Sequence, residues 1–307
     1  MSSGPRVSIL MATLNCVEYI ERTIATVTDQ SFEDWELIVM DACSTDGTVE
    51  AIQGLAHPNI RLHVEPDEGV SHAWDKAMRL ARGDYLLLLC GQDGYHDPDW
   101  LKTCVDTMDG DGEVSLVWGV PAHLLGEGGE LVPGGWWSVY VKDQELLAAH
   151  QKQGWLQQWL STGCTFPDGN MCIRREVYVS CVPAYRPGSR VMDMLHQFFY
   201  NFVSRGYMPW GVGRIVSFSR THEGQLSAVL AHQMRLSVHD YTRRVRRHRA
   251  RLLADELEHV FRDGAGQTVS VLPPLSGRVT MEHLLIRDQD GNLVDGTELF
   301  LAAFPAD

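Results

Sequence analysis

The chain has 307 residues, of which 44% are hydrophobic and 21% charged, and a formal net charge of -14 at pH 7. Such a composition is sufficient for a sizeable core. The acidic excess argues against nucleic acid as the main ligand, because it repels phosphate backbones. None of the seven cysteines forms a Cys-x-x-Cys pair, which favours a reduced, cytoplasmic compartment. We also expect neither a leader peptide nor a membrane span, since no apolar run approaches about 18 residues.

Short apolar runs alternate with segments of helical spacing over the first 120 residues. Val17, Ile20, Ile24 and Val27, for example, recur at the spacing of one helix face. This alternation predicts a mainly parallel sheet with right-handed crossovers. The expected strands are 7–11, 37–40, 60–64, 85–90 and 114–120, and the expected helices are 17–28, 48–55, 70–81 and 98–108.

The pattern is less regular after residue 120. Glycines and prolines between 119 and 135 suit a loop or a hairpin. The remaining expected elements are a helix-like stretch at 143–159, a strand at 171–174, an aromatic-rich helix at 191–204, a strand at 215–219, a long helix at 226–261 and a small β-rich part at 268–304.

Two carboxylates stand where predicted strands end. Asp41 closes the run 37–40, and Asp93 follows the run 85–90. Ligands of open α/β sheets bind beyond the carboxyl ends of their strands. The residues Ser44-Thr45-Asp46-Gly47-Thr48 open a helix directly after Asp41. This pattern suits a nucleotide on one side and a divalent cation on the other, and therefore chemistry on an activated phosphate ester.

Four segments in order resemble family 2 glycosyltransferases, which have the GT-A fold. Residues 11–15 (MATLN) look like the end of the family's first strand, and 39–48 (VMDACSTDGT) are similar to its VVDDGSTDGT signature. Residues 65–78 (EPDEGVSHAWDKAM) follow the pattern EPDKGIYDAMNKGI, and 80–85 (LARGDY) resemble LATGEY. The resemblance covers about residues 6–100.

The resemblance implies an α/β fold: a GT-A type nucleotide-binding sheet flanked by helices, with a C-terminal helical segment and a small β-rich appendage. It further implies a glycosyltransferase domain at 1–225, with a nucleotide-binding half at 1–120 and an acceptor half at 121–225. Residues 226–307 would form the C-terminal helix and the appendage.

The resemblance also implies a donor site for a nucleotide sugar. Its expected residues are Ala12, Thr13, Asn15, Asp41, His72, Lys76 and Gln92. Asp93 would bind the cation, Mn²⁺ or Mg²⁺, that bridges the diphosphate. The family usually has Asp-Asp where this chain has Gln92-Asp93, and the Gln92 amide adds no negative charge for a metal.

The acceptor side is implied by the second half of the chain. Residues 169–175 (GNMCIRR) resemble the segment before the family's acceptor helix, and Asp193 lies in the neighbourhood of its catalytic acid. In an inverting transferase this acid takes the proton of the attacking hydroxyl. His222 looks like the family's late histidine, a further cation ligand or phosphate donor. The implied reaction moves a sugar from a UDP-sugar to a glycan, lipid-linked or small-molecule acceptor, in polysaccharide or glycolipid synthesis.

Each assignment has a structural alternative. Asp41 and Asp46 can cap the helix that follows, Asp93 can be a turn residue, and Asp193 can be a helix N-terminal charge. His72 and His222 can be ordinary surface histidines. A protein that keeps this fold to bind carbohydrate or nucleotide, without turnover, is therefore the second hypothesis. A dinucleotide dehydrogenase is disfavoured because no GxGxxG follows the first strand.

The run Arg243–Arg251 is the only concentrated basic segment. On a helix it would be either a solvated face or a surface attracted to anionic lipid. We accordingly expect a cytoplasmic protein, with peripheral contact to the inner membrane face as the second reading.

Overall fold

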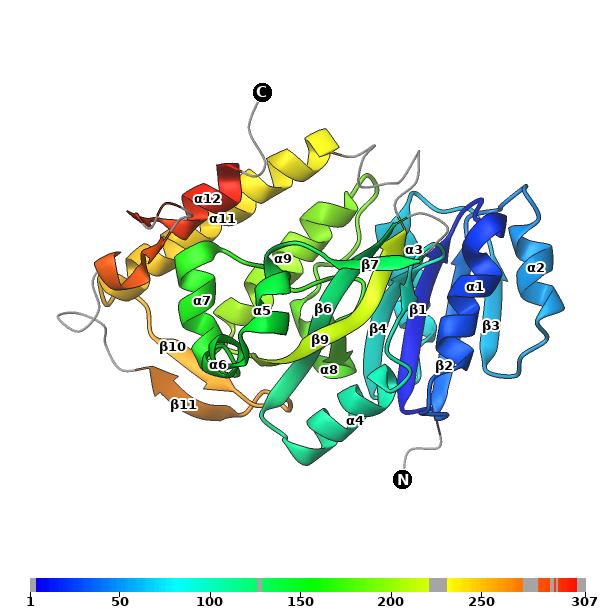
Figure 1. The fold of residues 1–307 in the computed structure, drawn as a ribbon, viewed down its shortest axis with the longest axis horizontal. Coiled ribbons are helices and arrows are strands. Elements are labelled where there is room, and N and C mark those ends of the chain that lie inside the picture. The colour runs from blue at the N-terminus through cyan, green and yellow to red at the C-terminus, as the bar shows by residue number, and fades with distance from the viewer. Residues whose placement is uncertain are drawn as a thin grey trace.

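The computed structural model describes residues 4–125, 129–220, 231–272, 281–287, 290 and 292–302 (Figure 1). Its strands are β1 (Val7–Thr13), β2 (Trp35–Asp41), β3 (Ile60–Val64), β4 (Tyr85–Cys90), β5 (Gly94–Tyr95), β6 (Val114–Leu125), β7 (Glu130–Pro133), β8 (Cys172–Arg174), β9 (Met208–Arg220), β10 (His259–Arg262), β11 (Thr268–Leu272), β12 (Ile286–Arg287) and β13 (Leu293–Val294).

The α-helices are α1 (Val17–Thr28), α2 (Thr48–Gly54), α3 (Val70–Leu80), α4 (Trp100–Gly110), α5 (Val139–Lys142), α6 (Gln144–Ala149), α7 (Gly154–Thr162), α8 (Arg175–Cys181), α9 (Val191–Ser204), α11 (Ala231–Leu253) and α12 (Gly296–Ala302). Two short 3₁₀ helices are η1 (Trp136–Ser138) and η2 (Met281–Leu284).

A nine-stranded sheet forms the centre of the described structure. Its order is β3-β2-β1-β4-β8-β6-β9-β5, and β7 pairs with β6. The first four strands are parallel to one another. Their carboxyl ends therefore meet at one edge, where ligands of such sheets bind.

Helices cover both faces of this sheet, which explains why β1 and β2 are buried along their whole length. Side chains of β1 alternate between the faces: Ile9 and Met11 share a core with α1 and α4, whereas Leu10 shares a core with α3 and α9. In Figure 1, α1 and α4 lie in front of the sheet and α3 behind it. The predicted α/β alternation of the first 110 residues is confirmed.

The expectation of a mainly parallel sheet is wrong beyond β4. Strand β8 is inserted between β4 and β6 and is antiparallel to both. The helix-like stretch 143–159 is also two helices, α6 and α7. The chain turns between them through Lys152, at φ 47°, and Gly154, where an added Cβ would lie 2.0 Å from the carbonyl oxygen of Ala149.

The long helix predicted at 226–261 ends earlier. Helix α11 stops at Leu253, and Asp255 has φ 54°, outside the helical region. Residues 259–262 then form β10, whose side chains alternate between buried and partly buried, and β10 pairs with β11. The part of the prediction at 226–230 lies outside the described residues.

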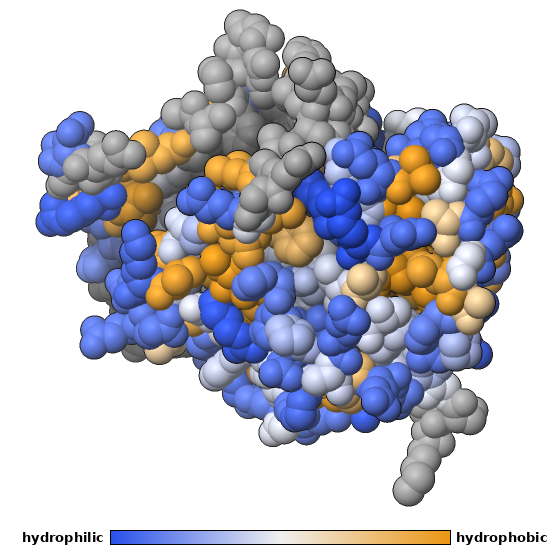
Figure 2. Space-filling view, turned by 45° about the vertical axis from the view of Figure 1, so that its right-hand side comes forward, coloured by the Kyte–Doolittle hydropathy of each residue, from blue (hydrophilic) through white to orange (hydrophobic). Residues whose placement is uncertain are grey.

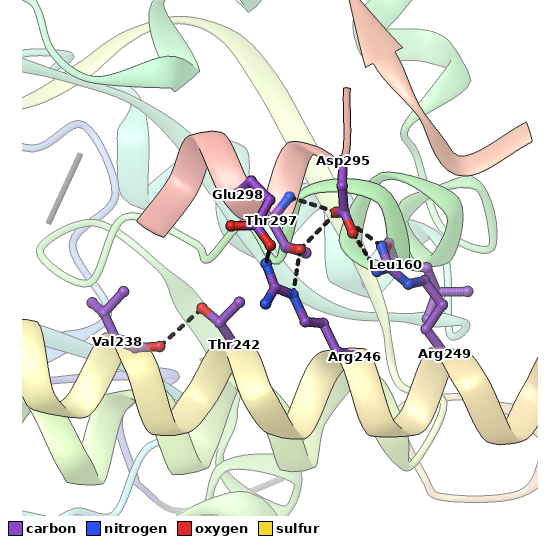
Figure 3. A network of polar contacts seen from close by, with 8 residues as sticks. All are labelled: Leu160, Val238, Thr242, Arg246, Arg249, Asp295, Thr297 and Glu298. Carbon is purple, nitrogen blue, oxygen red and sulfur yellow. Dashed lines mark hydrogen bonds and ion pairs between the residues drawn. The ribbon is translucent and has the colours of Figure 1, made fainter. Parts of the chain in front are cut away.

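The last helix, α12, is held on α11 by arginines of the basic run (Figure 3). Arg249 is buried and pairs with both oxygens of Asp295, at 2.6 and 3.1 Å. Arg246 donates to Thr297 at 2.8 Å and pairs with Glu298. Two arginines of the run therefore make structural contacts with α12. No helix within the described ranges is long and apolar enough to cross a membrane.

Candidate functional site

The ends of β1 and β2 are tied together by a buried carboxylate. Asp41 is fully buried, and its Oδ2 accepts hydrogen bonds from Thr13 Oγ1 at 2.9 Å and Ser44 Oγ at 2.6 Å. Its Oδ1 accepts from the Ser44 amide at 2.7 Å. Helix α2 begins only at Thr48, so Asp41 orders the loop beyond the sheet edge and does not cap that helix.

Asn15 completes this connection between the two strand ends. Its Oδ1 accepts from the Thr45 amide at 2.9 Å, and its own amide donates to Ser44 Oγ at 2.8 Å. Asn15 is exposed and has φ 47°, and neighbouring Cys43 is exposed with φ 64°. The result is a fixed platform, defined here as residues 13–15 and 41–45, at the carboxyl edge of β1 and β2.

Asp46 has a structural role. Its Oδ1 accepts from the amide and the hydroxyl of Thr48, at 3.0 and 2.6 Å, and its Oδ2 accepts from the amide of Val17 at 3.0 Å. These are the first residues of α2 and α1. The alternative that Asp46 satisfies helix N-termini is therefore the one that the contacts favour.

Asp93 lies in the turn that follows β4. Its amide donates to the carbonyl oxygen of Cys90 at 3.1 Å, and Thr23 Oγ1 donates to its carbonyl oxygen at 2.7 Å. These contacts use its backbone. Burial, and secondly the negative charge of Asp168, raise the pKa of the Asp93 carboxyl to about 7. The carboxylates of Asp93 and Asp168 are therefore close enough to interact.

Asp168 was not among the predicted site residues. Strand β8 pairs Cys172 with Leu87 of β4 and with Val117 of β6, so the residues just before β8 lie beside the carboxyl end of β4. Buried Asn170 fixes this segment by donating to the Gly119 carbonyl oxygen and to Ser217 Oγ, at 3.1 and 2.9 Å. Asp168 itself is exposed. Its signal in the sequence was an Asp-Gly-Asn turn directly before a predicted strand.

Arg220, at the end of β9, was also missed. Its Nη1 donates to the Gln92 carbonyl oxygen at 2.6 Å and to Thr23 Oγ1 at 3.1 Å. Its guanidinium lies over the rings of Phe218 and Tyr19, with centroids 4.9 and 5.6 Å away. Burial lowers the pKa of Arg220, while the negative charge of Asp93 opposes that shift. Arg220 therefore brings positive charge close to Asp93.

The oxygen donors Asp93 and Asp168 fit a hard divalent cation. Mg²⁺ and related ions take one or two protein carboxylates when phosphates supply further ligands. Within the described residues no group of three or more His, Cys, Asp or Glu side chains could hold a metal alone. Asp93 and Asp168 would thus hold such an ion only together with a ligand. His222, the other predicted ligand, lies outside the described residues.

His72 and Lys76 both hold the loop before α3. His72 Nδ1 accepts from the Glu68 amide at 3.2 Å, and its ring stacks on Tyr185 with centroids 4.4 Å apart. Lys76 Nζ donates to the Pro66 carbonyl oxygen at 2.7 Å. These contacts are structural. Contacts to a nucleotide sugar stay predictions for all seven expected donor-site residues, which are Ala12, Thr13, Asn15, Asp41, His72, Lys76 and Gln92.

Asp193 lies in the first turn of α9. Both its oxygens pair with Arg190, at 2.6 and 3.1 Å, and its side chain is 43% exposed. Ser71, at the start of α3, donates to the carbonyl oxygen of Ser189 at 3.1 Å, which links α3 to the segment before α9. Asp193 also lines a cleft of about 370 Å³ between α9 and α11. Its position suits both a base and a helix N-terminal charge.

Solved structures share this fold. A mannosyltransferase from Pyrobaculum calidifontis, in complex with GDP-Man and Mn²⁺, is 19% identical, with a TM-score of 0.58 over 80% of this chain and 65% of its own. S. aureus TarS 1-349, in complex with UDP-GlcNAc, is 14% identical, with a TM-score of 0.57 over 81% of this chain and 71% of its own. The expected α/β fold of GT-A type is confirmed. With the platform and Asp93 at the carboxyl edge of its sheet, the chain is an α/β protein of GT-A type.

The family model for glycosyl transferase family 2 matches residues 8–178, and the chain belongs to this family. Chondroitin synthase of Escherichia coli is 30% identical over 142 residues, 46% of this chain and 21% of its own length. Hyaluronan synthase of Pasteurella multocida is 26% identical over 160 residues, 50% of this chain and 16% of its own. The chain thus spans about a fifth of the length of these relatives.

Proposed function

We propose that this protein is an inverting glycosyltransferase that moves a sugar from a UDP-sugar to a hydroxyl group of a glycan, lipid-linked or small-molecule acceptor in polysaccharide or glycolipid synthesis. The observation that carries the proposal is the acidic pair Asp93 and Asp168 beside the platform of β1 and β2. The named relatives are polysaccharide synthases, which supports a glycan product. The structural neighbours hold GDP-Man or UDP-GlcNAc, which supports a nucleotide sugar without choosing the base.

In this mechanism the nucleotide lies on the platform and its diphosphate extends toward Asp93. The cation held by Asp93 and Asp168 would offset the charge that develops on the leaving diphosphate. Arg220 keeps the segment of Gln92 and Asp93 in place through the Gln92 carbonyl oxygen. Asp193 takes the acceptor proton as the hydroxyl oxygen attacks the anomeric carbon from the face opposite the diphosphate, which inverts that carbon.

A binding protein without turnover is the second candidate. Two observations favour it: Gln92 brings no charge to the cation, and Arg190 engages both oxygens of Asp193. A base must accept a proton, and an ion pair with Arg opposes protonation. This candidate expects nucleotide binding without any transfer or hydrolysis of the sugar.

Titration calorimetry with UDP and GDP, each with and without Mn²⁺, tests the proposal. We expect Mn²⁺-dependent binding of one nucleotide, weakened at least tenfold in Asp93→Asn, because the amide no longer neutralises the cation. Asp106→Asn removes the same charge from the exposed face of α4 and should bind as the unmodified protein does. If neither nucleotide binds, the proposal is wrong. If a nucleotide binds but its sugars are neither transferred nor hydrolysed, the binding protein is the better account.

A further inference from the structure

The cleft between α9 and α11 is rich in charged side chains. Its lining includes Asp193 and Arg190 from the start of α9, and Asp240, Arg243 and Arg244 from α11. The proposed base is therefore one wall of a space large enough for part of a sugar.

The two acids of this cleft are each neutralised by an arginine of their own. Asp193 pairs with Arg190, and Asp240 pairs with Arg243 at 3.2 Å. Arg244 differs: it donates to the neutral amide oxygen of Gln197, and its guanidinium lies 3.9 Å from the ring centroid of Tyr200. Among the described residues no carboxylate pairs with Arg244. Its positive charge is therefore not balanced by an acid, and its side chain is partly buried.

Other groups of the cleft supply hydrogen bonds without charge. His196 is buried, and its Nδ1 lies 2.8 Å from Ser237 Oγ. Burial lowers the pKa of His196 to about 4, so the ring is neutral at pH 7. Arg244 therefore accounts for the charge that the cleft offers to a ligand.

Three other arginines of α11, at positions 246, 247 and 249, differ from Arg244 in their surroundings. Arg246 and Arg249 pair with Glu298 and Asp295, on the side of α11 that faces α12 (Figure 3). Arg247 is exposed and does not line the cleft. A partly buried guanidinium that keeps an aromatic support but no acid is placed to bind an anion, since Arg matches carboxylate and phosphate with two parallel hydrogen bonds.

We propose that the cleft between α9 and α11 binds the acceptor, and that Arg244 selects acceptors whose sugar carries a carboxylate or a phosphate. The inference rests on the proposed function, because Asp193 must lie at the acceptor hydroxyl. The anion on Arg244 would orient the sugar so that one of its hydroxyl groups faces Asp193.

The test measures acceptor binding to protein saturated with the nucleotide and Mn²⁺, by calorimetry. The probes are three matched disaccharides that end in glucuronate, in glucose, and in glucose substituted with glycerol phosphate. We expect one anionic disaccharide to bind at least tenfold more tightly than the neutral one, and the two anionic arms tell carboxylate from phosphate. Arg244→Gln should abolish this preference, and Arg244→Lys should reduce it several-fold, because Lys keeps the charge but not the paired donors.

Arg247→Gln is the matched control, since it removes the same charge from the same helix outside the cleft and should keep the preference. Thermal unfolding of each variant checks that it is folded, and Arg244→Lys keeps the test decisive if Arg244→Gln is not. The inference is overturned if the neutral disaccharide binds as well as both anionic ones, or if Arg244→Gln and Arg247→Gln behave alike. If the nucleotide itself does not bind, the proposed function fails and the inference with it.

Discussion

One buried hydrogen bond joins the two strand ends that form the platform. Thr13 and Asp41 belong to neighbouring strands, and their bond at 2.9 Å is buried. We expect Thr13→Val to lower the free energy of unfolding by about 1 to 3 kcal/mol, because a buried carboxylate loses a donor while the side-chain volume is kept. Chemical denaturation measures this change. Thr107→Val, which removes only a local bond to the Thr103 carbonyl oxygen, should change the value by less than about 0.5 kcal/mol.

A buried histidine should make stability depend on pH. His259 is 2% exposed, neither ring nitrogen has a hydrogen-bond partner within the described structure, and it packs on His248 and Phe261. Burial, and secondly the charge of His248, lower the pKa of His259 to about 4. The unfolded chain, with a pKa of about 6.5, binds the proton first, so stability falls as pH decreases from about 6.5 toward 4.

Replacing His259 should reduce that dependence. Between pH 7 and pH 5 the histidine contributes a loss of about 2 kcal/mol, at about 1.4 kcal/mol per pH unit. We expect His259→Phe to lack this share of the slope when unfolding free energies are compared across pH. His96→Phe, at an exposed position, should leave the slope as it is. Equal slopes for His259→Phe and the unmodified protein would contradict the assignment.

At the scale of elements, α12 depends on one side chain of α11. Arg249 meets both oxygens of Asp295 and the carbonyl oxygen of Leu160 at 3.1 Å, which joins α11 to α12 and α7. We expect Arg249→Met to cost about 3 kcal/mol of unfolding free energy, since it leaves a partly buried carboxylate unpaired. The loss should also expose α12 to limited proteolysis. Arg243→Met, on the exposed side of α11, should resist cleavage like the unmodified protein.

Element boundaries were predictable where periodicity decides them. Helices α1 and α3 match their predicted ranges to within one residue, because their apolar spacing is regular. The end of α11 was missed because the sequence alone does not show that residues 259–262 pair with β11 as strand β10. The break between α6 and α7 was missed because Lys152, a residue without special backbone preference, takes the left-handed conformation there.

At the scale of the whole molecule, the order of the sheet was not predictable. The sequence of a strand as short as β8 does not reveal its neighbours. Its position between β4 and β6 is determined by tertiary packing. This insertion brings Asp168 to Asp93, so the second acid of the site was missed for the same reason as the topology. The positions of Asp41 and Asp93 at this edge were predictable, because Asp41 is the last residue of β2 and Asp93 lies in the turn after β4, and both strands are regular apolar runs. Their roles in binding stay predictions.

The exposed loop of the platform has a practical consequence. The seven cysteines are all free, and Cys43 is the one classed as exposed, whereas five are buried and Cys90 is partly buried. Cys43 lies between Asp41 and Ser44, at the rim of the platform on which the nucleobase of the proposed donor would lie. A maleimide dye would therefore label the native chain chiefly at this thiol. The fluorescence of that dye would report nucleotide binding at the platform in real time, without any engineered residue.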